Sequence, residues 1–454
     1  MSDGKLLFGT AHGVITPTMP VSLAGYFNVR MTTGVLDDLE VRALVLKKDG
    51  AAFLLLQFDL ITVSELLYVE LRKAIADLTE FGEENILMTA THTHTGPDFR
   101  PSCPVDASAY FDFLVEKASE VIHEAASNLR EGELAYTLTE DRRFCFNRRY
   151  WMKDGSVLTN PGKLNPQIYR PEGETDCEIP LVAILRDGKV QVLLANIVNH
   201  TDTIGGTEVS ADWAGFMRRT LEKQLGASSM VFPLIGCAGN INHFDVSTDR
   251  DQTCYAEAER IGIGYAQTVS RALENLRPVG DFTMKNLFAS AEVGGADISE
   301  REIRAAEKTL EKYADVPDAV GSKISLTSED LAKRSPIALK YFASSLLGIA
   351  KDRDMRRFRL TGLEMGPVVL VSLPSEPFVE IGLEIRRKIF PDKLCLVLSH
   401  GNGTGHVRLG GGYIPNRWNY GRGGYETEPR SNPFERATAE KLIEAWRKAA
   451  SAAR

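Results

Sequence analysis

Two histidines separated by one residue give the clearest chemical signal in the chain. They are His92 and His94, in the segment T-H-T-H-T-G-P over 91–97, which follows an apolar run over 86–90. Because alternate residues of a strand share a face, both imidazoles would point the same way where this run ends. The chain has eight histidines, and imidazole is a common zinc ligand. We therefore predict a metal site here; the alternative is that both rings only form hydrogen bonds within a loop.

Two known metal-binding patterns with this histidine spacing do not match the segment. Metallo-β-lactamase-like proteins carry H-x-H-x-D-H, whereas Gly96 and Pro97 follow the pair in this chain. Barrel amidohydrolases carry H-x-H on their first strand, but several predicted elements precede 91–97 here. The pair therefore points to a metal site of another kind.

A third histidine and a glutamate end two further predicted strands. His200 follows an apolar run over 190–198, and Glu376 stands where another run gives way to a predicted helix. Two histidines and one carboxylate at strand ends would form a zinc site with an open fourth position, and Asp212 could serve as a hydrogen-bond partner of an imidazole. The alternatives are that His200 is structural and that Glu376 only favours the positive end of the helix.

Arginines and aromatic residues form a second group of candidates. Arg148 offers a guanidinium that suits a developing oxyanion or a carboxylate; its alternative is a surface ion pair. The loop over 417–426, which includes Tyr425, mixes aromatic residues with arginines, and Arg100 and Arg149 could join it. We predict that these groups line a polar or anionic substrate pocket, with a solvated loop as the alternative.

A glycine-rich stretch over 401–412 invites comparison with phosphate-binding loops. No Gly-Lys-Ser or Gly-Lys-Thr follows it, and His406 breaks the G-x-G-x-x-G spacing. We instead expect the glycines to let the loop fold closely around the site and to direct Tyr413 toward it.

The elements that must position these residues follow a repeated pattern of hairpins. Apolar strands meet at Asp49-Gly50, at Asp187-Gly188 and at Gly366-Pro367, and the first two pairs are typical of tight turns. Further buried strands are predicted over 86–90, 230–235 and 394–398. Helices are predicted over 64–79, 109–129, 255–276, 298–313, 377–389 and 434–449. The fold class is therefore α/β: a layered domain with a mixed, largely buried β-sheet covered by helices. We expect a single domain over 1–454 with a helix-rich insertion at about 297–354.

Composition restricts the possible partners. The 454 residues are 43% hydrophobic and 25% charged, with 53 basic and 61 acidic residues and a net charge of −8. This balance argues against nucleic acid or an anionic membrane as a partner, and no apolar run approaches 18 residues.

The N-terminus lacks the basic and apolar regions of a secretory signal, so a cytoplasmic location is expected. The six cysteines form no C-x-x-C pair, so we expect reduced, buried thiols. A small molecule is the expected partner, and the oligomeric state is left open.

Taken in order, these segments resemble the catalytic domain of the neutral ceramidases, from about Gly9 to Pro429. The matching segments are G-T-A-H-G-V-I-T-P at 9–17, T-H-T-H-T-G-P at 91–97, S-A-D at 210–212 after His200, G-C-A-G-N-I-N at 236–242, the Glu376 segment and Y-I-P-N at 413–416. The resemblance implies one zinc ion per chain, held by His92, His200, Glu376 and Tyr413. It also implies that His94 is a catalytic neighbour of the metal rather than a ligand, and that Arg148 faces the substrate.

The chain departs from the family at one important position. Ceramidases carry Gly-Asp-Val-Ser-Pro-Asn, whose serine has been proposed as a nucleophile, whereas this chain has G-N-I-N-H over 239–243, with Asn242 in place of the serine. Asn242 can orient a substrate or donate a hydrogen bond, but it cannot act as that nucleophile. The chain also stops before the family's C-terminal immunoglobulin-like domain. Both departures favour a substrate other than ceramide.

Three functions are compatible with these residues. The first is a zinc-dependent hydrolase that cleaves an amide (N-acyl) bond in a polar or anionic substrate. The second is a metal-dependent lyase that acts on an acidic sugar or another carboxylate, which the arginines and the missing serine suggest. The third is a non-catalytic metal-binding protein.

Overall fold

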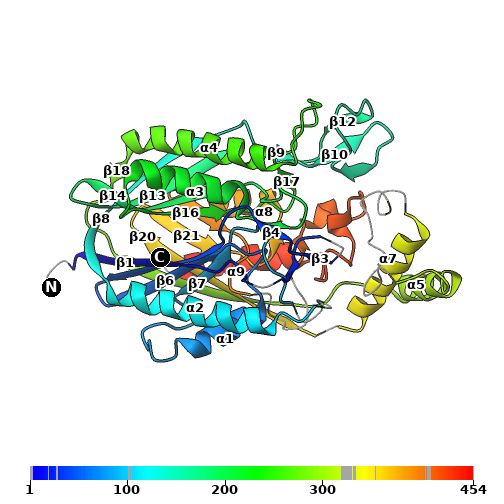
Figure 1. The fold of residues 1–454 in the computed structure, drawn as a ribbon, viewed down its shortest axis with the longest axis horizontal. Coiled ribbons are helices and arrows are strands. Elements are labelled where there is room, and N and C mark those ends of the chain that lie inside the picture. Colours follow the sequence, from blue (N-terminus) through cyan, green and yellow to red (C-terminus); the bar gives the residue numbers. More distant parts are fainter. Residues whose placement is uncertain are drawn as a thin grey trace.

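Two β-sheets face each other, and helices cover their outer faces (Figure 1). A computed structural model describes residues 4–18, 20–26, 29–100, 103, 105–318, 330, 334–352, 354–403, 405 and 411–452. His406, in the glycine-rich stretch, lies outside the described residues. The prediction of a layered α/β fold with a mixed sheet is confirmed, although the long strands divide between a nine-stranded and a four-stranded sheet, and short strands form further small sheets.

The larger sheet has nine strands and mixes parallel and antiparallel pairs. Its order is β16 (Met230–Ile235), β14 (Lys189–Ile197), β13 (Glu178–Arg186), β8 (Arg130–Glu140), β1 (Leu6–Val14), β5 (Glu40–Lys48), β6 (Ala51–Phe58) and β7 (Ile86–Ala90), with β18 (Arg277–Pro278) beside β8. The pairs β6–β7 and β14–β16 are parallel, whereas the other neighbours are antiparallel. Parallel pairs therefore stand at both ends of this sheet.

The smaller sheet has four strands in the order β19 (Met284–Val293), β20 (Arg356–Met365), β21 (Val368–Ser372) and β23 (Leu394–Leu398). Only its last pair, β21–β23, is parallel. The three predicted hairpins are confirmed as β5–β6, β13–β14 and β20–β21. Asp49 and Gly50 adopt φ angles of 51° and 84°, and Asp187 and Gly188 adopt 51° and 71°. Tight turns of this kind require positive φ at both central residues.

Helices cover the outer face of each sheet. The helices on the sheets are α1 (Glu65–Ala74), α2 (Ser108–Ser127), α3 (Asp212–Leu225), α4 (Tyr255–Ala272), α8 (Val379–Glu384) and α9 (Thr438–Ala452), whereas α5 (Glu300–Lys312) and α7 (Pro336–Ala350) lie apart from them. Helices α1 and α2 pack on one half of the large sheet and α3 and α4 on the other, as Figure 1 shows below and above the strands. Helices α8 and α9 pack on the small sheet. Within the described ranges, no helix combines the length and apolar character needed to cross a bilayer.

The strands are apolar on both faces because each lies between two cores. On β6, Phe53 and Leu55 face the smaller sheet, whereas Leu54 and Leu56 face the helices. The large sheet bends so strongly that its end strands β7 and β16 come into contact. Gln57 on β6 donates a hydrogen bond of 2.7 Å to the carbonyl oxygen of Pro233 on β16 across this closure. The near-continuous apolar runs in the sequence follow from this burial on both sides.

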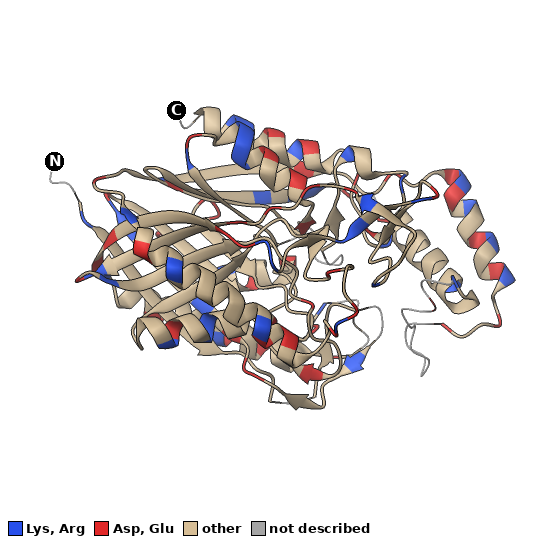
Figure 2. Cartoon of the chain, turned by 90° about the horizontal axis from the view of Figure 1, so that it is seen from above, with Lys and Arg blue, Asp and Glu red and all other residues tan. Residues whose placement is uncertain are grey.

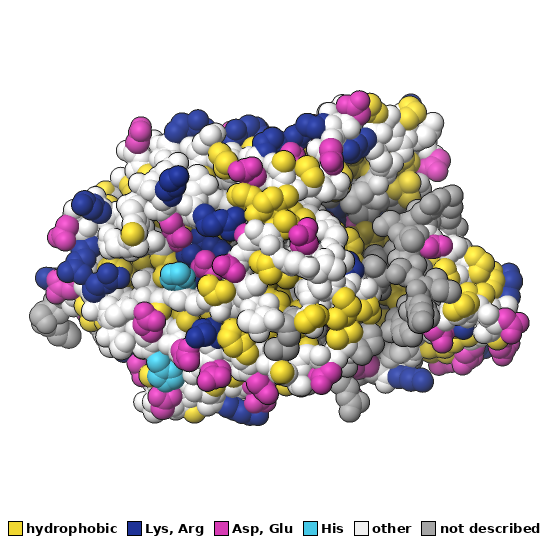
Figure 3. All heavy atoms as spheres, viewed as in Figure 1, with side chains coloured by type: hydrophobic (Ala, Val, Ile, Leu, Met, Phe, Trp, Pro, Cys, Tyr) yellow, Lys and Arg dark blue, Asp and Glu magenta, His cyan; other side chains and the backbone are white. Residues whose placement is uncertain are grey.

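The segment predicted as a helix-rich insertion, at about 297–354, contains α5 and α7 among its described residues, and these helices pack against each other at one end of the molecule (Figure 1). Helix α5 begins with a capping box, in which Ser299 and Glu302 satisfy each other's backbone N–H groups. Figure 2 shows charged residues mainly on helices and loops and few on strands. On the face drawn in Figure 3, basic and acidic side chains are interspersed.

Candidate metal centre

Four strands bring their carboxyl ends to one place. The end of β7 leads into His92, β14 leads into His200, β21 leads into Glu376 and β23 leads into His400. Each of these strands belongs to a parallel pair, and the carboxyl ends of parallel strands are the usual location of binding sites in α/β proteins. The strand-end residues predicted from the sequence are therefore brought together.

The predicted ligand atoms lie within a few ångströms of one another. His92 Nε2 lies 3.0 Å from His200 Nε2 and 3.3 Å from His94 Nε2. Glu376 Oε2 lies 3.4 Å from His92 Nε2 and 3.7 Å from His200 Nε2. The three histidines are buried and form a cluster whose ligand atoms all lie within 4.8 Å of one another. This cluster could hold a metal ion.

The spacing of these atoms fits zinc. Ligands at about 2.0–2.1 Å from a tetrahedral zinc ion lie about 3.3 Å apart. His92 Nδ1 lies 2.6 Å from the carbonyl oxygen of Ile61, and His200 Nδ1 lies 3.1 Å from that of Ala238. Both rings therefore donate through Nδ1 and present Nε2 lone pairs to each other. Glu376 Oε2 is likewise buried without a hydrogen-bond partner. The Nε2 lone pairs of His92 and His200 face each other beside the unpaired oxygen of Glu376, and a cation bound between them would stabilise this arrangement.

Burial and nearby charge keep His94 and His200 neutral. Burial and, to a smaller extent, neighbouring His92 lower the pKa of His94 to about 3. The pKa of His200 is also lowered, first by burial and then by the positive charge of Arg148. Burial would raise the pKa of Glu376, but nearby positive charge outweighs it, so the pKa lies below its usual value. A neutral imidazole and an ionised carboxylate are the protonation states that bind metals.

Backbone strain is concentrated at this centre. His92, Ser375 and His400 adopt φ angles of 62°, 57° and 58°. Left-handed conformations are unfavourable for residues with a side chain, and they persist where surrounding contacts hold them. His92 is itself a predicted ligand, Ser375 directly precedes Glu376, and His400 lies beside His92. Strain at these positions is expected of a functional site.

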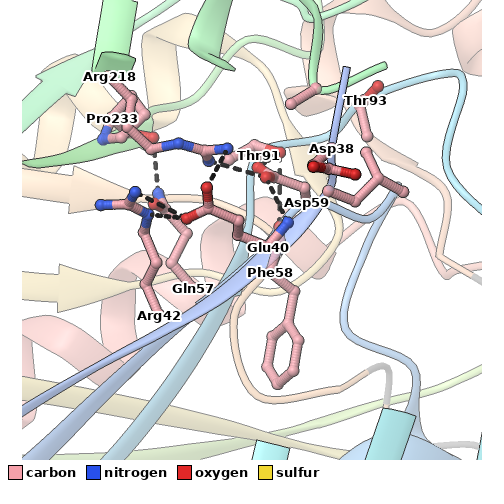
Figure 4. A network of polar contacts seen from close by, with 12 residues as sticks. Asp38, Glu40, Arg42, Gln57, Phe58, Asp59, Thr91, Thr93, Arg218 and Pro233 are labelled. Carbon is pink, nitrogen blue, oxygen red and sulfur yellow. Dashed lines mark hydrogen bonds and ion pairs between the residues drawn. The ribbon is translucent and has the colours of Figure 1, made fainter. Parts of the chain in front are cut away.

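A buried ionic network supports the strand end that carries His92 (Figure 4). Thr91 donates a hydrogen bond of 3.0 Å to Asp59 Oδ1, and Arg218 on α3 donates one of 2.7 Å to Asp59 Oδ2. Arg218 also lies 3.5 Å from the carboxylate of Glu40. Burial would raise the pKa of Glu40, but Arg218 and its other partners lower it well below the usual range. The network thus joins α3 and two strands beneath the His92 segment.

Thr201 links the His92 and His200 segments directly. Its hydroxyl donates a hydrogen bond of 2.6 Å to the carbonyl oxygen of Thr91, and its own carbonyl oxygen accepts one of 3.2 Å from the N–H of His94. Trp213 Nε1 donates to the carbonyl oxygen of His200 at 2.8 Å. The two hydrogen bonds of Thr201 fix the two histidine segments relative to each other, and the bond from Trp213 ties His200 to α3.

A short parallel bridge places Tyr413 beside Glu376. The strands β22 (Glu376–Pro377) and β24 (Tyr413–Ile414) pair so that these two residues are direct partners. The hydroxyls of Tyr413 and Tyr425 lie 3.4 Å apart. Burial and the charge of Glu376 raise the pKa of Tyr413 well above its usual value. The fourth predicted ligand is therefore next to the third.

Arg148 borders this side of the centre. Its guanidinium lies 5.2 Å from the ring centre of Tyr413 and 5.7 Å from that of Tyr425. It donates a hydrogen bond of 2.7 Å to the carbonyl oxygen of Gly239, and its Nε lies 3.3 Å from Glu426 Oε1. Burial opposes its charge, but the two tyrosines and Glu426 outweigh burial and raise its pKa. A fixed positive charge therefore stands beside the predicted ligands.

Comparison with known proteins supports the fold. No family model matches the chain, and no curated protein sequence matches it. A solved ceramidase, described as complexed with C2, superposes with a TM-score of 0.72 at 16% identity, covering 100% of this chain and 76% of that one. The neutral ceramidase from Pseudomonas aeruginosa gives a TM-score of 0.70 at 16% identity, covering 100% of this chain and 75% of that one. The fold is ceramidase-like. At this identity, the similarity establishes the fold alone.

Two predicted substrate-binding arginines are engaged in ion pairs. Arg149 is fully buried, with its Nε 2.5 Å from Glu172 and its Nη1 2.7 Å from Glu426. Arg100 makes two hydrogen bonds to Asp98, at 2.8 and 2.6 Å. These contacts orient the arginines toward carboxylates of the chain itself.

Two other predicted residues also have internal partners. Asn242 donates a hydrogen bond of 3.0 Å to Asn160 and accepts one of 3.1 Å from the N–H of Phe244. Asp212 accepts one of 3.0 Å from the N–H of Ile204, whereas the imidazole of His200 contacts a carbonyl oxygen. Asp212 therefore shapes the loop that follows His200 rather than supporting its ring.

The structure adds three residues that the sequence analysis did not single out. His400 stacks on His92, with ring centres 4.1 Å apart and an angle of 19° between the planes. Buried His243 pairs with the partly exposed Asp202, with Oδ1 and Nδ1 3.5 Å apart. His400 could have been found, because it follows a predicted buried strand just as His200 does. No pattern of neighbouring residues in the sequence predicts that Asp202 pairs with His243.

Proposed function

We propose that this protein is a zinc-dependent hydrolase that cleaves an amide (N-acyl) bond in a polar or anionic small molecule. One observation carries the proposal: the Nε2 atoms of His92 and His200 and the Oε2 atom of Glu376 converge with the spacing of zinc ligands. The ceramidase-like fold supports it, because the two similar structures are ceramidases by description.

In this proposal, His92, His200, Glu376 and Tyr413 hold one zinc ion per chain. Zinc at such a centre supplies a Lewis acid that polarises a carbonyl group and acidifies water. The chain contributes the orientation of the ligands through the carbonyl oxygens of Ile61 and Ala238.

Two further side chains act on the substrate. His94 is neutral, and its buried Nδ1 has no hydrogen-bond partner, so it can accept a proton during the reaction and release it again. Arg148 keeps its charge beside Tyr413 and would stabilise the negative charge that develops on the carbonyl oxygen. Asn242 cannot supply a serine-type nucleophile, so water is the nucleophile.

Hydrolysis is favoured over the lyase reaction. The lyase hypothesis rests on arginines that hold a carboxylate substrate, but Arg100 and Arg149 are paired with carboxylates of the chain. A lyase would convert uronate substrates into an unsaturated product, and this product would absorb ultraviolet light. We expect no such absorbance.

Metal analysis tests the proposal. We expect about one zinc per chain in the wild type, lost in His92→Ala and His200→Ala, together with turnover of N-acyl substrates in the wild type. His123→Ala is the matched control, because this partly exposed histidine pairs with Asp77 on the surface. The absence of zinc in the wild type, or equal zinc in all variants, would refute the metal centre; zinc without N-acyl turnover would refute the amidase reaction.

A further inference from the structure

Asp202 presents an available carboxylate oxygen beside the metal centre. It follows His200 by two residues on the loop that leads to α3, and its side chain is 17% exposed. Its Oδ1 is buried and faces His243. Within the described part of the chain, no hydrogen bond reaches its Oδ2. Oδ1 thus lies at ion-pair distance from His243 without a hydrogen bond, and Oδ2 is free to accept a hydrogen bond.

His243 keeps this carboxylate in place. Its Nε2 lies 2.7 Å from the carbonyl oxygen of Gln252, so Nε2 carries a proton, and its Nδ1 faces Asp202 Oδ1 at 3.5 Å. Burial would lower the pKa of His243, but Asp202 outweighs burial and the pKa is raised. Because both ring nitrogens of His243 face oxygen acceptors, the ring fixes the position of the Asp202 carboxylate.

The carboxylate lies near the predicted proton acceptor. The residue before it, Thr201, accepts the backbone hydrogen bond from His94. The ring of Tyr26 lies edge-on to His94, with ring centres 5.5 Å apart. The charge of Asp202 acts on both Tyr26 and His94. Tyr26 is 38% exposed, so the ring that packs on His94 also reaches the molecular surface.

We propose that Asp202 accepts a hydrogen bond from the N–H of the scissile amide and then from the departing amine, so that the site selects amides over esters. This inference rests on the proposed hydrolase function. Hydrolysis forms a bond between the oxygen of water and the carbonyl carbon and breaks the carbon–nitrogen bond. At neutral pH the products are a carboxylate and an ammonium ion, because both protons of the water end on nitrogen. An ester has lone pairs where the amide has N–H, so a fixed carboxylate repels it.

A matched pair of substrates tests the selection. An acyl p-nitroanilide and the p-nitrophenyl ester of the same acid would be compared with zinc-loaded wild type, Asp202→Asn and His243→Gln. We expect Asp202→Asn to lower kcat/KM for the anilide at least tenfold more than for the ester, and His243→Gln to act in the same direction. Asp245→Asn is the control, because its carboxylate lies near His243 in sequence but bonds Ser247. Its anilide-to-ester ratio should equal that of the wild type. Zinc content and thermal unfolding check that each variant is folded.

The outcomes separate this inference from the proposed function. If the wild type hydrolyses the anilide and Asp202→Asn lowers both substrates equally, the role of Asp202 is refuted and the hydrolase proposal stands. If the wild type cleaves neither substrate, the amidase proposal fails, and calorimetry with n-butylammonium then decides the inference. Binding that weakens at least tenfold in Asp202→Asn supports the acceptor role. Equal binding in both proteins, or none in the wild type, overturns it.

Discussion

Thr201 should control the metal centre without contacting the metal. Thr201→Val keeps the shape of the side chain but removes the 2.6 Å hydrogen bond from its hydroxyl to the carbonyl oxygen of Thr91, next to His92. Thr201 is fully buried, so water cannot replace the lost donor. An unmade buried hydrogen bond costs about 1–3 kcal/mol. If this cost appears in metal binding, zinc affinity falls roughly 5- to 150-fold.

Competition between the protein and a coloured zinc chelator measures this affinity. Thr201→Ser is the matched control, because it keeps the hydroxyl and should bind zinc nearly as tightly as the wild type. Thermal unfolding of the metal-free proteins separates a general loss of stability from a change at the site. Zinc affinity within twofold of the wild type in Thr201→Val would show that this hydrogen bond does not position His92.

Two further predictions concern stability. Arg218→Met leaves the buried carboxylate of Asp59 without its cation, whereas Glu40 keeps Arg42. The free energy of unfolding in urea should therefore fall by about 3–5 kcal/mol. Arg219→Met, which removes a partly exposed pair with Asp37, should cost less than about 1 kcal/mol, and equal losses would contradict the role of the network. Burial raises the pKa of Glu380 from 4.5 to about 7. The folded state therefore binds this proton more tightly than the unfolded state does. The contribution of Glu380 to stability should fall as the pH rises from about 4.5 to about 7. Glu380→Gln should remove this part of the pH dependence in urea unfolding measured between these values, and an unchanged pH profile would rule it out.

Much of the secondary structure is encoded locally. The strands over 86–90, 230–235 and 394–398 have the predicted bounds, because short apolar runs between polar loops carry their own signal. The Asp-Gly turns are equally local. The strands β1, β8 and β19 and the helix α3 had no such signal. Neither did the division into two sheets, because a strand buried on both faces has the same sequence whether its second face meets a helix or another sheet.

The sequence by itself determined the candidate ligands His92, His200 and Glu376, because each follows a strand whose apolar pattern is local. Only the tertiary structure decided which polar side chains have partners. Arg149 pairs with Glu426, which lies 277 residues away, and Tyr413 meets Glu376 through a bridge between distant segments. The partner of a charged side chain is set by packing between segments far apart in the chain, and no pattern of neighbouring residues records it.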